Sequence, residues 1–289
     1  MYKIIKLFLL IQIFIVLIII TSCSNLESNN EYKLKEAINT NIIFGFIESL
    51  NPLIISGFEF GINRDRFSKI KNDGLNFYDK LREGQNVIAN YTNLEDSLEI
   101  TSIKSDYIII APVSFVSSNE LIVLNQKVVI PDNISKEIPE IIPGHWVRIS
   151  GLYQKEGKII ANYIEVIPSQ SFGFIKGKVS QIEKSFISIG KQKFEIRAPF
   201  TSTISGDIVK IVFTKDGDLF KTFKVENLSN QYLNLVNRNI IVEGFVFEGD
   251  DKKMRLSGYP FVIYNSNHLI AGKKVLIKGR ILPGSIIDN

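Results

Sequence analysis

Short stretches in which hydrophobic and polar residues alternate follow one another along most of this chain. Four of them read Gly-x-x-Val-x-(Ile or Ala), and they start at Gly84, Gly144, Gly206 and Gly272. The intervals between these glycines are 60, 62 and 66 residues (144−84, 206−144 and 272−206). A turn glycine that leads into an alternating strand at a nearly constant interval predicts one small β unit repeated four times.

The residues that follow these glycines keep a common register. Ile100 and Ile103 lie 16 and 19 residues after Gly84. The corresponding pairs are Thr222 and Val225, at 16 and 19 residues after Gly206, and Ala161 and Ile164, at 17 and 20 residues after Gly144. Because a slip of one residue would exchange the two faces of a strand, this agreement indicates repeats rather than general β-richness. Alternation points the following residues inward: Val87, Val147, Val209 and Val275, with Ala89, Ile149, Ile211 and Ile277.

About five short strands in roughly 60 residues bury enough apolar surface only if the sheet closes on itself. We therefore predict an all-β protein of four tandem small OB-like β-barrel repeats, at 42–106, 107–168, 169–228 and 238–289. The first repeat is interrupted at Asn63–Arg82, where loosely helical spacing predicts one or two short helices. Short connections predict four separate cores, so the fragments Asn41–Asp106 and Ser169–Leu228 should each fold alone.

The fourth repeat is predicted to be truncated. Position 16 after Gly272 is Asp288, one residue from the end, so we expect the closing strand to be missing. This repeat would then leave a sheet edge open or borrow a strand, and an open edge is a place where a partner strand can add.

The N-terminal residues follow a different pattern. Lys3 and Lys6 precede the apolar run Leu7–Ile20, which only Gln12 interrupts. A basic start followed by about 14 apolar residues is typical of a secretory signal, whereas a membrane-spanning helix usually needs about 20. Residues 23–41 are mostly polar and predict a flexible tether to the first repeat.

The segment Ile20-Thr21-Ser22-Cys23 resembles the lipobox of bacterial lipoproteins. The resemblance implies that residues 1–22 are a signal peptide and that the cysteine is diacylated and becomes the new N-terminus. It also implies a lipid-anchored protein of the cell envelope, with the outer membrane or the cell surface favoured. A plain signal peptide with an incidental cysteine and an uncleaved membrane anchor are the alternatives. Since Cys23 is the only cysteine, no disulfide within the chain is expected.

The repeats also resemble a bacterial envelope domain of unknown function that often occurs in tandem in exported proteins (the DUF5666 type). Gly177-Lys178-Val179 matches its opening strand, and Gly144–Gly151 and Gly206–Ile211 match its central stretch. Ala161–Ile164 matches its closing stretch. The likeness is best in the second and third repeats, and it implies no known activity.

Composition excludes several functions. Without Lys3 and Lys6 the chain has 32 basic and 30 acidic residues, a balance of +2 that is too weak to argue for nucleic acid. Hydrolytic or redox chemistry needs a nucleophile with a base, a metal cluster or paired carboxylates. His145 and His268 lie in different repeats without metal-ligand spacing, and Asp216-Gly217-Asp218 and Asp250-Asp251 have the composition of hairpin turns, with calcium binding as the alternative. We therefore expect no enzyme, no cofactor and no metal.

Two places are candidates for partner contact. If Val147 and Ile149 point inward, Trp146 and Arg148 point outward, either as an interface anchor or packed against a neighbouring repeat. Lys274, Lys278 and Arg280 lie on the expected open edge of the fourth repeat, farthest along the chain from the lipid.

Aromatic and basic residues in the third repeat permit one further interpretation. Its phenylalanines and lysines imitate an oligonucleotide-binding face, or they are core residues beside solvated edges: Phe172, Phe174, Phe186 and Phe194, with Lys176, Lys178 and Lys184. Because export removes the usual substrate, we expect no nucleic acid and instead a protein or glycan partner.

These observations predict a membrane-anchored envelope lipoprotein that acts as a non-catalytic array of interaction or binding modules. A structural spacer of the envelope is the alternative, followed by a carbohydrate-binding or hydrolytic envelope protein.

Overall fold

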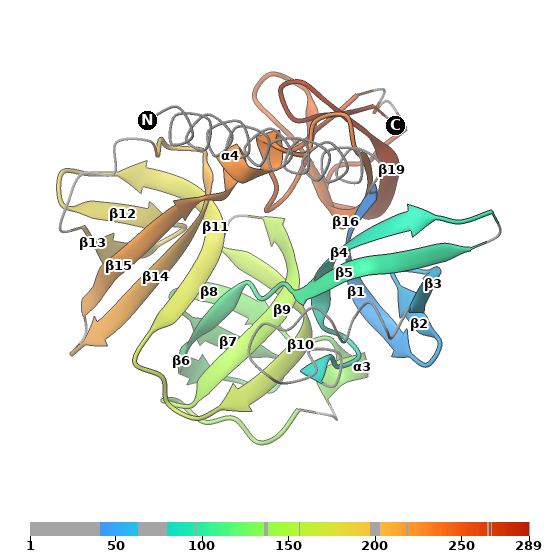
Figure 1. Cartoon of the computed structure of the whole chain (residues 1–289). Coiled ribbons are helices and arrows are strands. Elements are labelled where there is room, and N and C mark those ends of the chain that lie inside the picture. The colour runs from blue at the N-terminus through green and yellow to red at the C-terminus, as the bar shows by residue number, and fades with distance from the viewer. Residues whose placement is uncertain are drawn as a thin grey trace, which may run out of the picture. The chain divides into compact units, whose positions relative to one another are not determined.

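The computed structural model describes residues 41–288 except 63–79, 96, 136–137, 156, 197–202, 218, 265 and 267. This part of the chain is built almost entirely of β-strands (Figure 1). Barrel 1 contains β1 (Asn41–Leu50), β2 (Leu53–Ile55), β3 (Phe58–Ile62), β4 (Asn86–Asn93) and β5 (Leu98–Ser105). Barrel 2 contains β6 (Ile109–Val116), β7 (Glu120–Val123), β8 (Gln126–Val129), β9 (Trp146–Lys155) and β10 (Lys158–Ile167).

Barrel 3 contains β11 (Gly173–Ile182), β12 (Phe186–Ile189), β13 (Gln192–Glu195), β14 (Ile208–Asp216) and β15 (Leu219–Asn227). Barrel 4 contains β16 (Asn239–Glu248), β17 (Met254–Leu256), β18 (Val262–Ile263), β19 (Lys274–Leu282) and β20 (Ile286–Asp288). Two short helices lie in connections: α3 (Asp132–Ser135) in barrel 2 and α4 (Leu228–Leu233) between barrels 3 and 4. The helices expected at Asn63–Arg82 fall largely outside the described residues.

Each group of five strands closes into a ring in the same way. The strands pair in the order first, second, third, fifth, fourth, and the fourth pairs back to the first. The third and fifth strands are parallel in every ring, whereas the other pairs within a ring are antiparallel. The chain therefore forms four OB-like five-stranded barrels, which confirms the predicted fold class.

A β-bulge explains the spacing of the closing residues. Residues three apart on a regular strand face opposite sides, yet Ile100 and Ile103 are both buried. The pairing of β4 with β5 skips Thr101, so this strand carries one extra residue between them. The equivalent extra residues are Asn162 in β10 and Phe223 in β15. The bulge thus turns both members of each closing pair toward the core.

The fourth barrel closes with its own strand, contrary to the prediction. β20 pairs antiparallel with β19 and parallel with β18, so residues 286–288 supply the closing strand. The turn before β20 is only a few residues long, so that the ring closes earlier after Gly272 than the register of the other repeats predicts. The expected open edge at Lys274–Arg280 does not exist, because β19 has β16 on one side and β20 on the other.

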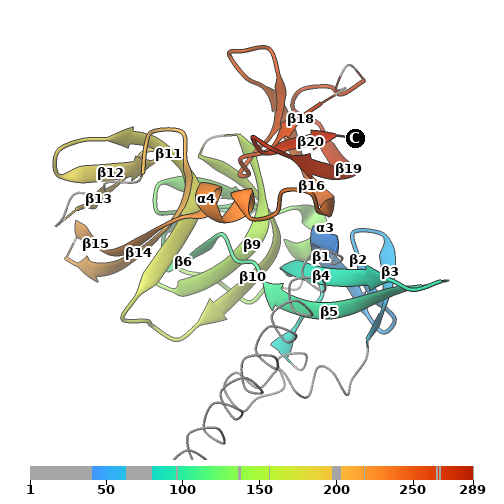
Figure 2. The ribbon, with the colours of Figure 1, turned by 45° about the horizontal axis from the view of Figure 1, so that its top comes forward.

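The barrels are joined in pairs, first with last and second with third (Figure 1). β1 runs parallel to β16, with Ile43 beside Ile241. β6 runs antiparallel to β11, with Ile109 beside Ile175. Figure 2 shows the same arrangement from another side, with α4 leading from barrel 3 to barrel 4. Barrel 4 therefore lies beside barrel 1, although their sequences are at opposite ends of the described chain.

The cores follow this pairing. Barrels 2 and 3 share one hydrophobic cluster, in which Val147 and Val209 are fully buried. The cluster of barrel 4 includes Ile42 and Phe44 from β1, and that of barrel 1 includes Ile241 from β16. The expectation of four separate cores is therefore wrong, because strands at the barrel boundaries are buried on both faces. Of the residues predicted to point inward, Val275 alone is only half-buried, and it packs against the barrel 4 cluster.

Candidate functional site

A cavity of about 560 Å³ lies where barrels 2, 3 and 4 meet, and we call it the junction cavity. Barrel 2 contributes the start of β8 and the β9–β10 hairpin. Barrel 3 contributes the β12–β13 turn and the start of β14, and barrel 4 contributes the β17–β18 turn. The volume is within the range of small-molecule sites, roughly 300 to 1,000 Å³. No single repeat contains the site, since its walls come from three barrels.

Tyr153 separates the three barrels at the base of this cavity. Its hydroxyl donates a hydrogen bond of 2.5 Å to the carbonyl oxygen of Lys176 in barrel 3. Its ring lies against Gly258 of barrel 4, where a Cβ would come within 3.0 Å of a ring carbon. Gly258 has a φ of +80°, so the turn and the close approach both favour glycine. The side chain therefore holds two neighbouring barrels at a defined distance.

The junction contains three tyrosines in an apolar environment. Tyr232 of α4 and Tyr259 of barrel 4 have ring centroids 6.3 Å apart, and both contact Phe261. Burial raises the pKa of all three hydroxyls, those of Tyr153, Tyr232 and Tyr259, above the ordinary value, and the Asp106 carboxylate adds to this at Tyr232 and Tyr259. They remain neutral at physiological pH and act as hydrogen-bonding groups rather than as bases.

The lining of the junction cavity is positively charged. It includes three cationic side chains, Lys155, Lys178 and Arg255, and one carboxylate, Asp207. The Asp207 carboxylate is already engaged, since Oδ2 accepts hydrogen bonds from the Ile204 amide at 3.0 Å and from Asn227 at 2.7 Å. Arg255 donates to Asp251 at 2.7 Å, whereas the ammonium groups of Lys155 and Lys178 are paired with no carboxylate among the described residues.

A second cavity, of about 450 Å³, lies where barrels 1 and 3 and α4 meet. Of its cations, Lys176 forms an ion pair with Asp106, and Lys210 lies 4.3 Å from the centroid of the Phe174 ring. The hydrogen bond from Lys224 lowers the pKa of Glu226, which also lines this cavity. Because its charges are largely balanced within the protein, the junction cavity is the better candidate for a ligand site.

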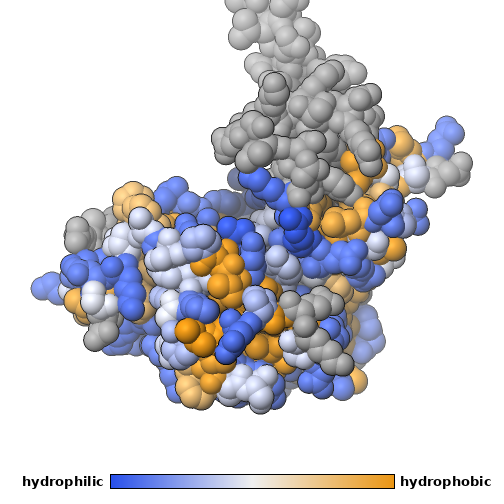
Figure 3. Space-filling model, turned by 90° about the horizontal axis from the view of Figure 1, so that it is seen from below, coloured by the Kyte–Doolittle hydropathy of each residue, from blue (hydrophilic) through white to orange (hydrophobic). Residues whose placement is uncertain are grey.

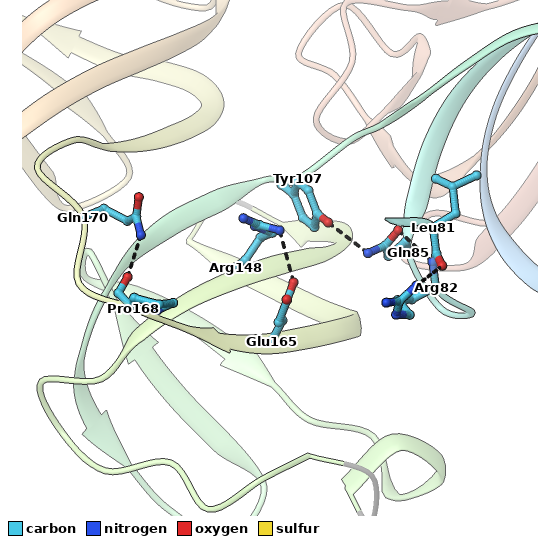
Figure 4. Close-up of polar contacts among 8 residues, drawn as sticks. All are labelled: Leu81, Arg82, Gln85, Tyr107, Arg148, Glu165, Pro168 and Gln170. Atoms are coloured by element: carbon cyan, nitrogen blue, oxygen red, sulfur yellow. Dashed lines mark hydrogen bonds and ion pairs between the residues drawn. The ribbon is translucent and has the colours of Figure 1, made fainter. Parts of the chain in front are cut away.

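Arg148 belongs to the contact between barrels 1 and 2 (Figure 4). It forms an ion pair with Glu165 at 3.2 Å, and its guanidinium lies 5.0 Å from the centroid of the Tyr107 ring. The Tyr107 hydroxyl in turn accepts a hydrogen bond from Gln85 of barrel 1 at 2.9 Å. Trp146 is half-buried and lies opposite Pro112 and Ile167 in the sheet, away from the junction cavity.

The basic residues of β19 contact the protein itself. Lys274 forms an ion pair of 2.5 Å with Glu243, and its ammonium lies 5.2 Å from the centroid of Phe46 in barrel 1. The ammonium of Lys278 lies 4.3 Å from the centroid of Phe58, also in barrel 1. Arg280 donates to the carbonyl oxygen of Asn237 at 3.3 Å. The surface predicted for partner contact therefore forms part of the contact between barrels 1 and 4.

The phenylalanines of barrel 3 divide between core and surface. Phe194 is fully buried, which agrees with the core interpretation. Phe172 and Phe223 are exposed and in contact with each other, with centroids 4.9 Å apart. Other exposed apolar side chains are distributed among hydrophilic ones, as on the face shown in Figure 3. Scattered apolar residues of this kind are normal for a protein surface and identify no site.

Several sequence-based predictions concern residues that the structure does not describe or leaves without a cluster. Cys23 lies outside the described residues. Within residues 41–288, where described, no group of three or more His, Cys, Asp or Glu is placed to hold a metal ion. Among these same residues there is also no helix with the length and apolar character needed to cross a membrane.

Sequence reasoning missed the residues that line the junction cavity. Gln126, Lys155, Lys178 and Arg255 come from three repeats, and each looks like an ordinary strand-end residue in the sequence. A partial signal was present in the glycines Gly157, Gly190 and Gly258, which occupy turns with positive φ around the cavity. Their convergence depends on how the barrels pack, which repeat periodicity does not determine.

No family model and no curated protein matches this chain. Among solved structures, a multidomain protein with nucleic acid binding domains from Streptococcus pneumoniae TIGR4 is similar over 61% of this chain and 68% of its own. The two are 16% identical and superpose with a TM-score of 0.18.

The expectation that excluded nucleic acid as a partner is contradicted by this neighbour, and we withdraw it. The charge balance and the expected export were too indirect to support an exclusion. At 16% identity and a TM-score of 0.18, the likeness itself carries no argument that this chain binds nucleic acid.

Proposed function

We propose that this chain is a lipid-anchored protein of the bacterial envelope that binds a small ligand in the junction cavity and performs no catalysis. The observation that carries the binding proposal is a cavity of about 560 Å³ with unpaired cations on its wall. The apolar run followed by Ile20-Thr21-Ser22-Cys23 supports the lipid anchor.

The binding proposal is preferred to the structural spacer because of the way the barrels pair. A spacer would hold its last module far from its first, whereas β1 and β16 are neighbouring strands of one sheet. This pairing brings barrel 4 back beside barrel 1 and creates the walls of a cavity between barrels.

The binding site is tested by protein purified in detergent from the cells that make it. Small molecules released on denaturation are identified by mass spectrometry for wild type, Pro260→Trp and Pro168→Trp. Pro260 lines the junction cavity, so the indole should occupy it, whereas Pro168 lies exposed in the β10–β11 connection. We expect one compound to be released by wild type and Pro168→Trp but not by folded Pro260→Trp. Release of no compound, or equal release by Pro260→Trp, would show that the cavity is not a binding site.

The lipid anchor is tested separately by Cys23→Ala. This variant should lose metabolic labelling with a fatty acid and leave the detergent phase, because the thiol that receives the lipid is absent. A variant that still partitions with detergent would indicate an uncleaved apolar anchor instead.

A further inference from the structure

One buried amide oxygen in the junction cavity is without a hydrogen-bond donor among the described residues. Gln126 is fully buried, and its Nε2 donates to the carbonyl oxygens of Leu124 and Ile189, each at 3.0 Å. Because these two bonds use both amide hydrogens, the orientation of the amide is determined and Oε1 cannot exchange places with Nε2. Oε1 is left as an unsatisfied acceptor in the wall of the cavity.

Glycines at two turns keep side chains away from this oxygen. A Cβ on Gly190 would lie 3.1 Å from Oε1, and a Cβ on Gly157 would lie 3.9 Å from it. Both residues have positive φ and both line the junction cavity. A buried acceptor without a partner costs about 1 to 3 kcal/mol, so a ligand that donates an O–H or N–H here gains a contact that the protein does not supply itself.

The charges and the apolar wall define the rest of the ligand. Lys155 and Lys178 are exposed and unpaired with acids among the described residues, so they attract an anionic group without first breaking an ion pair. The rest of the wall is largely apolar or aromatic: Tyr153, Ile189, Phe247, Leu256, Tyr259 and Pro260. A ligand of this cavity should combine a negative charge, at least one hydrogen-bond donor and a compact ring with apolar C–H faces.

We propose that the junction cavity binds an acidic sugar, with its anionic group at Lys155 and Lys178 and a hydroxyl donating to Gln126 Oε1. This inference rests on the proposed function, since it names the ligand class of the same cavity. A sugar carboxylate and a sugar phosphate share the chemistry that the site recognises. The site lies between barrels rather than on the exposed strands of one barrel.

The test is calorimetric titration of the detergent-solubilised full chain with four probes. Glucuronate and glucose 6-phosphate carry the charge and the hydroxyls, glucose lacks the charge, and cyclohexanecarboxylate lacks the hydroxyls. We expect the two acidic sugars to bind at least tenfold more tightly than glucose and than cyclohexanecarboxylate. A difference between glucuronate and glucose 6-phosphate identifies whether a carboxylate or a phosphate is the natural group.

Charge variants connect the affinity to the cavity. Lys155→Gln and Lys178→Gln should each weaken the acidic sugars about tenfold and leave glucose unchanged. Lys184→Gln is the matched control, because Lys184 is an exposed lysine of the same barrel as Lys178 and does not line the cavity. These exposed positions leave the core intact, so the comparison does not depend on the buried Gln126.

Three results would overturn the acidic-sugar inference: no binding by any probe, equal binding of glucose and glucuronate, or unchanged affinity in both cavity lysine variants. If the compound released from the wild-type protein is neutral or lacks hydroxyls and is absent from Pro260→Trp, the binding function stands and only the ligand class is wrong. If no compound is released and the probes do not bind, both proposals are wrong.

Discussion

Tyr153 is the residue through which three barrels contact one another. Its ring belongs to the shared core of barrels 2 and 3, its hydroxyl bonds to β11, and its edge lies against Gly258 of barrel 4. We expect Tyr153→Ala to lower the free energy of unfolding by about 3 to 5 kcal/mol, as for other large aromatic truncations in cores. Tyr153→Phe, which loses only the hydrogen bond, should cost about 1 kcal/mol.

Urea unfolding followed by tryptophan fluorescence measures both effects on Tyr153. Tyr264→Ala is the matched control, because Tyr264 is 58% exposed and should change the stability by less than about 0.5 kcal/mol. Equal losses for Tyr153→Ala and Tyr264→Ala would mean that the junction does not stabilise the protein.

Tyr232 makes the stability depend on alkaline pH. Burial, with the Asp106 carboxylate, raises its pKa above 10.0, so the folded state keeps the proton when the unfolded state has lost it. This contribution is fully present below pH 10 and decreases as the pH rises from there, by about 1.4 kcal/mol per pH unit. Tyr232→Phe should therefore remove about 1.4 kcal/mol of the stability loss between pH 9 and about pH 11, measured by urea unfolding at each pH. An identical decrease in wild type and Tyr232→Phe would contradict the argument.

Single residues show where the sequence was informative. Val87, Val147 and Val209 are buried as the alternation predicted, because a strand's period of two is a local property. Gln126 could not be identified, because its role arises from the carbonyl of Ile189 in another barrel. Arg148 and Lys274 were identified as notable residues, but their partners come from other segments and show them inside contacts between barrels.

The closing strand of each barrel is the element in which the repeats differ most. In barrels 1 to 3 it carries the bulge residues Thr101, Asn162 and Phe223, whereas the short pairing of β20 with β19 shows no such shift. Asn162 uses the bulge to contact barrel 1, through a hydrogen bond of 3.0 Å to Asn86. At the same place in barrel 3, Phe223 is exposed. One local irregularity therefore serves either a contact between barrels or the surface.

Gly279 allows β20 to close barrel 4. A Cβ at this position would overlap the backbone oxygen of Asp288, so Gly279→Ala should displace β20 and cost about 1 to 3 kcal/mol. Gly61→Ala is the matched control in barrel 1, because its Cβ would lie an ordinary 3.6 Å from the oxygen of Leu98. It should be neutral or stabilising, since alanine loses less backbone entropy than glycine. Amide hydrogen exchange should show faster exchange in Ile286–Asp288 for Gly279→Ala only, and unchanged protection there would refute the role of this strand.

The pairing of the first and last barrels had a sequence signal at the level of elements. Ile42-Ile43-Phe44 and Ile240-Ile241-Val242 are continuous apolar runs, which are typical of strands buried on both faces. Within the structure these runs lie beside each other in parallel. Alternation elsewhere in the repeats made four independent barrels the simpler prediction, and the runs alone do not identify which strands pair.

At the scale of the whole molecule, the pairing of barrels determines which parts can fold alone. Barrels 2 and 3 share a cluster, so residues 107–228 contain a complete core. Barrel 1 packs Ile241 of barrel 4 into its cluster, and barrel 4 packs Ile42 and Phe44 of barrel 1 into its own. The buried Glu243 of β16 also accepts a hydrogen bond of 2.5 Å from Ser56 of barrel 1. Neither terminal barrel is complete without the other.

We therefore expect residues 107–228 to unfold cooperatively as an isolated fragment, whereas residues 41–106 alone should not. Adding residues 238–289 in trans should restore structure to residues 41–106, because the two apolar runs then pair and bury their exposed faces. Circular dichroism and thermal unfolding of each fragment, and of the two terminal fragments mixed, measure this. Ile241→Lys in the added fragment is the control that should abolish the rescue, since it places a charge in the barrel 1 cluster. Cooperative unfolding of residues 41–106 without any partner would show that barrel 1 is an independent module and that the β1–β16 pairing is not required for its stability.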